Sequence, residues 1–205
     1  MSGGIRAVKK GRLLFGVLFL MTGLILIAIP LYHEWQQGKS VSAMEDALSL
    51  IAEADGEPID LSEINNLPLT EEELKNVLEL EVPYVGIKQM VLSQTTEENL
   101  AIGLTQIKEN QTPGEGNFTI AGHRGYRDGR HFSNLAEVPT GEKVYLHTKN
   151  QTFVYEITSS KVIEPTDVDV LNDEGDTKEI TLITCTISGA QRVAVKGKLI
   201  DTMQK

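Results

Sequence analysis

One sulfur atom is the most reactive group that the sequence offers. Cys185 is the only cysteine among 205 residues, so no disulfide can form within the chain. A lone thiol is either a small buried apolar side chain or a nucleophile for acyl transfer, and the cysteine count alone does not choose between them. A nucleophilic role needs help, because the thiolate is the reactive form and an imidazole or another positive group usually promotes it.

Four histidines are available to assist the thiol. His33 borders an apolar run and His147 alternates with polar residues on a strand-like run, so both have simpler surface roles. His123 follows the strand-like run NFTIA and a glycine, and His131 lies in a loop between an arginine and a phenylalanine. Position alone favours His123 and His131 equally as partners of the thiol.

Acyl transfer also requires a group that stabilises negative charge on the carbonyl oxygen. Arg192 opens the strand-like run that follows Cys185, and two strands joined by a short turn would bring the two side chains close. Other arginines compete for this role on composition alone, and they are Arg124, Arg127 and Arg130.

A buried strand is expected to position the cysteine. The run EITLITC over 179–185 has apolar residues on both alternating faces and stops at a Ser-Gly-Ala turn signal at 188–190. Other short β-like runs precede and follow it, and they cover 83–87, 90–92, 117–121, 143–148, 152–158 and 192–199. A helix from Thr70 to about Leu78 and one helical turn at 96–100 interrupt them. Short, regularly spaced strands with few helices predict a mainly β fold, either a sandwich or a barrel.

The N-terminal part has a different composition from the rest. Residues 1–12 are basic and contain no acid, and residues 13–32 are uncharged and long enough to cross a membrane. This pattern predicts a cytoplasmic tail and a single-pass anchor with the remaining chain outside the cell membrane, in preference to a cleaved signal peptide. Residues 33–80 are expected to form an extracellular spacer, with helix-favouring composition at 43–54. Residues 81–205 form the predicted catalytic domain.

The net charge of −10 limits the possible partners. Because nucleic-acid binding needs a basic surface, an acidic body argues against a nucleic-acid partner. The acidic residues are better explained by solubility.

Three of these features together resemble the sortase family over roughly residues 83–201. They are the TLITC run at 181–185, the Ala-Gly-His run at 121–123 and Arg192, which match the family's TLxTC signature, its catalytic histidine and its essential arginine in the family's order. The resemblance implies an eight-stranded sortase-type β-barrel with short helices, preceded here by one transmembrane helix. It also implies that His123, and not His131, is the catalytic imidazole.

The resemblance further implies a transpeptidase that cleaves an LPXTG-like sorting signal between Thr and Gly. Cys185 would form a thioacyl enzyme, His123 would act as acid and then as base, and Arg192 would hold the substrate. The Thr184 side chain or nearby backbone N–H groups would support the oxyanion. The acyl group would pass to an amino group of the peptidoglycan precursor lipid II, so secreted LPXTG proteins and that precursor are the expected partners.

Positions around the active site carry further implications of the resemblance. The run 164–171 matches the family's long loop before the cysteine strand, and Ala121, Pro165 and Ile183 are expected to contact the signal. Some relatives bind calcium beside this loop, but the matching positions here are Lys108, Gln111 and Glu115. Because a lysine ammonium repels the ion, we expect no calcium and no other metal or cofactor.

Subclass and rival functions stay open at this point. Class A fits best, because no convincing lid of the pilus-building enzymes is found in residues 55–82, although the run 123–130 also resembles class D. Two rivals are a hydrolytic cysteine protease and a non-catalytic, membrane-anchored binding module with Cys185 merely buried.

Overall fold

The computed structural model describes residues 3–53, 60–125 and 129–205. Arg127, part of the predicted spacer (54–59) and part of the loop after His123 (126–128) lie outside these residues. The helices are α1 (Gly3–Glu53), α2 (Glu71–Lys75) and α3 (Glu97–Ile102), with 3₁₀ turns η1 (Pro83–Val85), η2 (Leu135–Glu137) and η3 (Val168–Leu171). The strands are β1 (Leu78–Val82), β2 (Ile87–Leu92), β3 (Leu104–Gln106), β4 (Asn117–Ala121), β5 (Lys143–His147), β6 (Gln151–Ile163), β7 (Glu179–Cys185) and β8 (Arg192–Gln204).

The strands close into one barrel in the order β1-β2-β3-β4-β7-β8-β6-β5. The pairs β2–β3 and β4–β7 are parallel and all other neighbours are antiparallel. This confirms the eight-stranded barrel. Closure leaves no unpaired edge, so every strand can pack its inner side chains into one core.

The barrel interior is filled by apolar side chains from all parts of the sheet. Strand β7 contributes Ile180 and Leu182, which are completely buried against residues such as Phe118 and Val195. Because side chains alternate along a strand, Ile183 and Cys185 project from the opposite face and are only half-buried. The strand therefore fixes the cysteine rigidly while leaving its sulfur on the side that faces outward.

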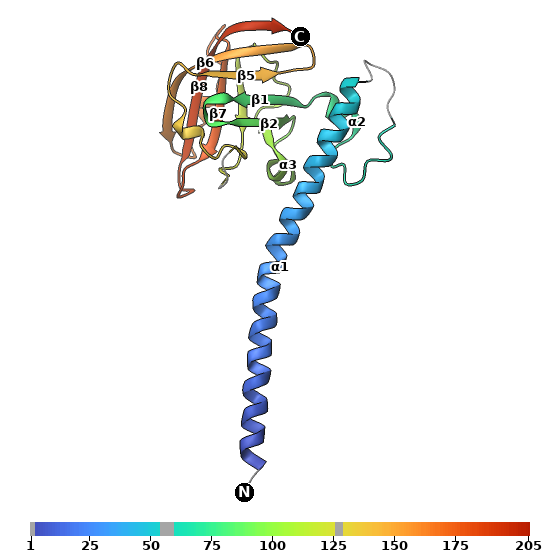
Figure 1. The fold of residues 1–205 in the computed structure, drawn as a ribbon. Coiled ribbons are helices and arrows are strands. Elements are labelled where there is room, and N and C mark those ends of the chain that lie inside the picture. Colours follow the sequence, from blue (N-terminus) through green and yellow to red (C-terminus); the bar gives the residue numbers. More distant parts are fainter. Residues whose placement is uncertain (1–2, 54–59, 126–128) are drawn as a thin grey trace.

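Helix α1 is one continuous element that leaves the barrel as a long stalk (Figure 1). Pro30 lies inside the helix without ending it, and large apolar side chains between Leu13 and Leu31 are exposed. Within the described residues this helix is long and apolar enough to cross a membrane. The predicted anchor over 13–32 and the predicted helix at 43–54 are thus parts of one helix, which is observed as far as Glu53.

The end of α1 packs against the short helices beside the barrel. Ala43, Met44 and Ala47 are buried, and their spacing places them on one face of the helix. The helix contacts α2 and α3 there, and α2 begins at a Thr70–Glu73 capping box as the sequence predicts. The expected spacer therefore includes a rigid arm that is docked beside the barrel.

Two predictions of local structure were wrong. The run 83–87 is not a strand, because Pro83 starts a 3₁₀ turn that ends at Gly86 in the left-handed conformation. The helix predicted to reach Leu78 stops at Lys75, and β1 starts at Leu78. The helix is shorter because the alternating run LELEV at 78–82 buries its apolar residues as a strand of the barrel.

Candidate active site

Two parallel strands bring the cysteine and one histidine to the same edge of the sheet. Ala121 at the end of β4 pairs with Ile183 of β7, and the Gly122 amide donates a hydrogen bond to the Ile183 carbonyl at 3.1 Å. His123 and Cys185 each follow this pair by two residues. Because β4 and β7 are parallel, both residues lie just beyond the end of the paired region, at the same edge of the sheet.

A cavity of about 590 Å³ joins these two side chains. Cys185 is half-buried in its wall, whereas the His123 side chain is exposed. The cavity is lined by Glu34, Gln37, His123, Arg124, Gly125, Arg130, His131, Cys185, Thr186, Ile187, Ser188 and Gly189. A half-buried thiol beside an exposed imidazole, in a cavity of this size, can react with a peptide carbonyl that enters from solvent.

The predicted arginine lies directly across the sheet from the cysteine. Arg192 begins β8 and is paired with Cys185 in the antiparallel register, which places their Cβ atoms about 4.5–5.5 Å apart. Its Nη1 atom donates hydrogen bonds of 3.1 Å to the carbonyls of Gly189 and Gln191. The β7–β8 turn thus holds one side of the guanidinium, although Arg192 itself is not among the residues that line the cavity.

The structure also distinguishes between the two candidate histidines. His131 lines the same cavity but is only 7% exposed, and burial together with the positive Arg130 and His123 lowers its pKa to about 4. An imidazole that remains neutral at physiological pH is a poor partner for a thiolate, because an ion pair needs the protonated ring. Exposure and registry with Cys185 therefore favour His123.

Helix α1 forms part of the cavity wall, which the sequence did not predict. Arg130 donates a hydrogen bond from Nη2 to Gln37 Oε1 at 3.4 Å, and its Nη1 lies 3.9 Å from Glu34 Oε1. These contacts join Arg130, which follows His123 in the chain, to helix α1. No local pattern in the sequence signals them, because the partners are separated by more than ninety residues.

The remaining predicted site residues lie in three different environments. Thr184 is buried, and its hydroxyl has no hydrogen-bond partner among the described residues. Because it points to the face of β7 opposite Cys185, the structure does not bring its hydroxyl into the cavity. Ala121 and Ile183 lie side by side on the outer face, and Pro165 is exposed in the β6–β7 loop.

Lys108 is one of the three positions that the family resemblance matches to calcium ligands, and it forms an ion pair within the chain. Lys108 Nζ lies 2.9 Å from Asp173 Oδ1, which also accepts a 2.6 Å hydrogen bond from the Asn117 amide. The two hydrogen bonds hold the pKa of Asp173 below its usual value. The side chain of Asn117 adds hydrogen bonds to the carbonyls of Val170 and Asn172. The sequence singled out Lys108 but not Asp173 and Asn117, whose hydrogen bonds hold the β6–β7 loop against β4.

Known proteins resemble this chain in sequence and in fold. The family model described as a sortase domain matches residues 80–200. Sortase A of Bacillus anthracis is 32% identical over 199 residues, which covers 92% of this chain and 94% of the relative. The structure of Listeria monocytogenes sortase A superposes with a TM-score of 0.58 at 31% identity, covering 62% of this chain and 89% of that one. A Clostridium perfringens sortase D5 transpeptidase has a TM-score of 0.62 at 28% identity, with coverage of 78% and 99%.

Proposed function

The chain belongs to the sortase family of cysteine transpeptidases, which anchor surface proteins, and from this premise we propose its substrates and the roles of its residues. The donor substrate is a secreted protein with an LPXTG-like signal that is cleaved between Thr and Gly. The acceptor is an amino group of the peptidoglycan precursor lipid II. Similarity to a sortase A along nearly the whole chain favours class A over class D.

Cys185, His123 and Arg192 carry the reaction in this proposal. The Cys185 thiolate attacks the threonine carbonyl, and the peptide C–N bond breaks as the His123 imidazolium gives its proton to the leaving amine. The thioester is then attacked by the acceptor amine, whose proton passes to His123 while the C–S bond breaks. Arg192 balances the negative charge on the carbonyl oxygen in both steps.

One observation supports this assignment more than any other. A single stretch of β7 is in register with β4 on one side and with β8 on the other, so Cys185 has His123 and Arg192 on either flank. Arg192 is paired with Cys185 in the sheet, and His123 lies two residues beyond the Ala121–Ile183 pair. Such preorganisation is what acyl-transfer catalysis requires.

The outer face next to the cysteine is suited to an extended peptide. Ala121 and Ile183 are paired, half-buried and on the same face as Cys185, so they form an apolar floor that leads to the sulfur. Glu164 of the β6–β7 loop accepts a 2.7 Å hydrogen bond from Gln191, which keeps the start of this loop beside Arg192. We place the Leu-Pro part of the signal between this floor and Pro165.

Activity without calcium is also proposed. The Lys108 ammonium lies within hydrogen-bonding distance of Asp173. This ion pair ties the β6–β7 loop to the segment before β4, where some related enzymes bind calcium. We likewise propose that α1 anchors the enzyme in the cell membrane, with the N-terminus in the cytoplasm and the barrel outside.

A product analysis tests the proposed function. The full chain in detergent is incubated with an LPXTG peptide, alone and with an amine that mimics the peptidoglycan stem, and the products are weighed. We expect a Cys185 thioester, and an amide product that replaces hydrolysis as the amine concentration rises. Unchanged product ratios would indicate a hydrolase, and cleavage retained by Cys185→Ala would refute the mechanism.

A further inference from the structure

Among the described residues, the ring of His123 is held by a contact with another ring and not by a hydrogen bond. The side chain is exposed, and no residue in the described ranges makes a hydrogen bond to its ring. Its recorded ring contact is with His131, with centroids 6.3 Å apart and planes at 85°. An edge-to-face pair at this separation is an attractive arrangement with a defined orientation.

His131 is itself fixed more firmly than its neighbour. Its ring is buried, it forms a hydrogen bond with the Gly103 backbone, and its Nδ1 atom has no partner among the described residues. Gly103, whose backbone is the partner of this ring, directly follows α3. A backbone hydrogen bond of 3.0 Å from the Phe132 amide to the His123 carbonyl closes the loop between the two rings.

The backbone conformation at His131 also restricts which residues can occupy this position. His131 has a φ of +50°, in the left-handed region that few side chains other than glycine, Asn, Asp and His adopt readily. The neighbouring backbone is tightly closed, because a Cβ at Gly125 would lie 2.5 Å from the Arg130 carbonyl oxygen. The chain thus presents one buried ring to His123 from a backbone conformation that histidine adopts more readily than most residues.

From this geometry we infer that His131 is a positioning residue, whose fixed ring sets the orientation of the His123 imidazole toward Cys185. The inference rests on the proposed catalytic role of His123. It gives His131 no contact with the substrate and no proton to transfer. A freely rotating imidazole would spend much of its time unable to protonate the leaving amine, and misplacement of a catalytic group can cost about 100-fold in rate.

The charge state of His131 agrees with this role. The charged or titratable groups around the shared cavity are Glu34, His123, Arg124, Arg130 and Cys185. A second imidazolium next to Arg130 would repel the proton that His123 must carry, and desolvation prevents this by keeping the buried ring neutral. The positioning ring can therefore contact the catalytic ring without opposing its protonation.

Two substitutions separate the ring contact from the hydrogen bond to Gly103. His131→Phe keeps a flat ring and loses the bond, whereas His131→Gln keeps an amide N–H near the Nε2 position and loses the ring. Both replacements bear the same unfavourable positive φ, so backbone strain is matched between them. The matched control is His147→Gln, which removes a ring stacked on Tyr145 at the same 6.3 Å separation but outside the cavity.

Steady-state transpeptidation by the full chain, with an LPXTG peptide and a stem-like amine, gives kcat and KM for each variant. We expect His131→Gln to lower kcat roughly 10- to 100-fold with KM for the peptide unchanged, and His131→Phe to retain most of kcat. His147→Gln should match the parent enzyme. A thermal melt establishes that each variant is folded at the assay temperature, and a lower temperature is used for both if one is not.

The ordering of kcat decides the inference. A kcat for Phe about tenfold or more above that for Gln supports positioning by the ring, and equal values or the reverse order overturn it. An inactive parent enzyme that forms no thioester would refute the proposed function instead. The two failures are therefore distinguishable in the same experiment.

Discussion

At the scale of single residues, the site depends on how side chains with many conformations are held in one. Arg192 shows this most directly. One of its nitrogens, Nη1, donates to two carbonyls of the β7–β8 turn, at Gly189 and Gln191. Since a guanidinium is planar, fixing one nitrogen fixes the direction of the others. The turn therefore aims the remaining N–H groups, and it does so before any substrate binds.

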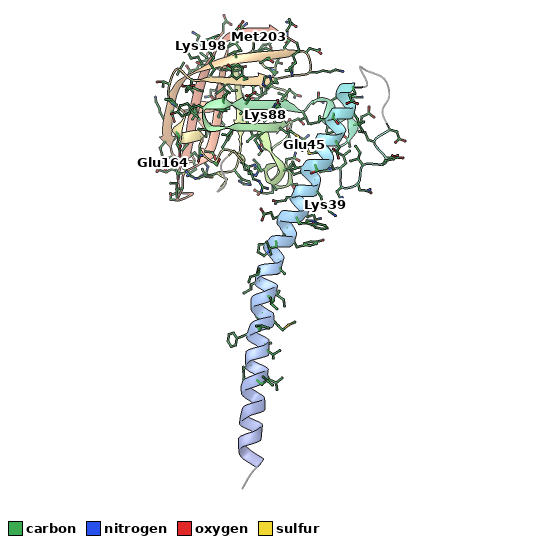
Figure 2. All side chains as sticks on the ribbon, viewed as in Figure 1. Lys39, Glu45, Lys88, Glu164, Lys198 and Met203 are labelled. Atoms are coloured by element: carbon green, nitrogen blue, oxygen red, sulfur yellow. The ribbon has the colours of Figure 1, made fainter. Side chains whose placement is uncertain are left out.

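This arrangement predicts that Arg192→Lys is severely impaired although the charge is kept. An ammonium cannot use the turn for orientation and simultaneously present a planar donor pair, so we expect kcat to fall roughly 10²- to 10³-fold. Thioester formation measured by mass spectrometry in a rapid-quench experiment checks the step affected. Lys198→Arg is the control, because this exposed side chain of β8 lies at the other end of the barrel from Glu164 (Figure 2). Near-parental activity of Arg192→Lys would contradict the role.

His131 predicts a pH dependence of stability. Its pKa is lowered from 6.5 to about 4 on folding, so between these values the unfolded chain binds more protons than the folded one. The stability that the neutral ring contributes is complete above the unfolded pKa and is lost as pH falls toward the folded one. Its full size is at most roughly 3 kcal/mol.

Urea unfolding of the parent and of His131→Phe should reveal this contribution. The difference in free energy of unfolding between them should change by about 1–2 kcal/mol from pH 7 to pH 5, with the parent losing more. Comparing two chains cancels the carboxylates that titrate in both. A difference that does not vary with pH would show that the folded ring titrates normally.

At the scale of elements, the β6–β7 loop depends on the contacts of Lys108, Asn117 and Asp173. The Lys108–Asp173 pair is partly exposed, and such pairs contribute only about 0.2–1 kcal/mol. Asp173 does more, because its oxygen also caps the backbone at the start of β4. The carboxylate, and not the salt bridge alone, therefore holds the loop.

This difference predicts a graded response to substitution. Lys108→Gln should raise KM for the sorting peptide by up to about 5-fold, the equivalent of one exposed ion pair. Asp173→Ala should raise it above about 10-fold, because a charge-assisted hydrogen bond of about 1.5–3 kcal/mol is lost as well. Peptide titrations of initial rate measure both. Added calcium should change neither the parent nor Lys108→Gln, and activation of the parent by calcium would contradict the proposed independence.

The sequence predicted those elements that local patterns define. Strand β7 with its cysteine, the strands on either side of it and the capped helix α2 were all visible as alternation or capping signals. Strand β3 was missed because its three residues are too short for a pattern. The role of Glu34 and Gln37 could not be predicted, because only the docking of α1 on the barrel brings them to the cavity. His131 was found as a candidate, but its burial, which assigns it a different role, is a property of the folded loop.

At the scale of the whole molecule, helix α1 contributes to the same cavity as Cys185 and His123. Glu34 and Gln37 line the cavity, and Trp35 lies between them on α1 with its side chain 57% exposed. A helix rises about 1.5 Å per residue, so these positions lie within about 5 Å of one another along the axis. Tyr32 and Trp35 follow the apolar stretch where interfacial aromatics are common. The cavity is therefore expected to open close to the lipid headgroups.

Trp35 is the only tryptophan of the chain, so its fluorescence can test this arrangement. In vesicles, lipids that carry a spin label near the headgroup should quench it more strongly than lipids labelled deep in the acyl chain. A water-soluble quencher should have a limited effect, because the ring is at the interface and Lys39 covers one face at 3.6 Å. Efficient aqueous quenching with no lipid quenching would place the cavity well above the membrane. In that case the rigid arm would act as a spacer, and a lipid-linked acceptor would have to extend away from the surface to reach Cys185.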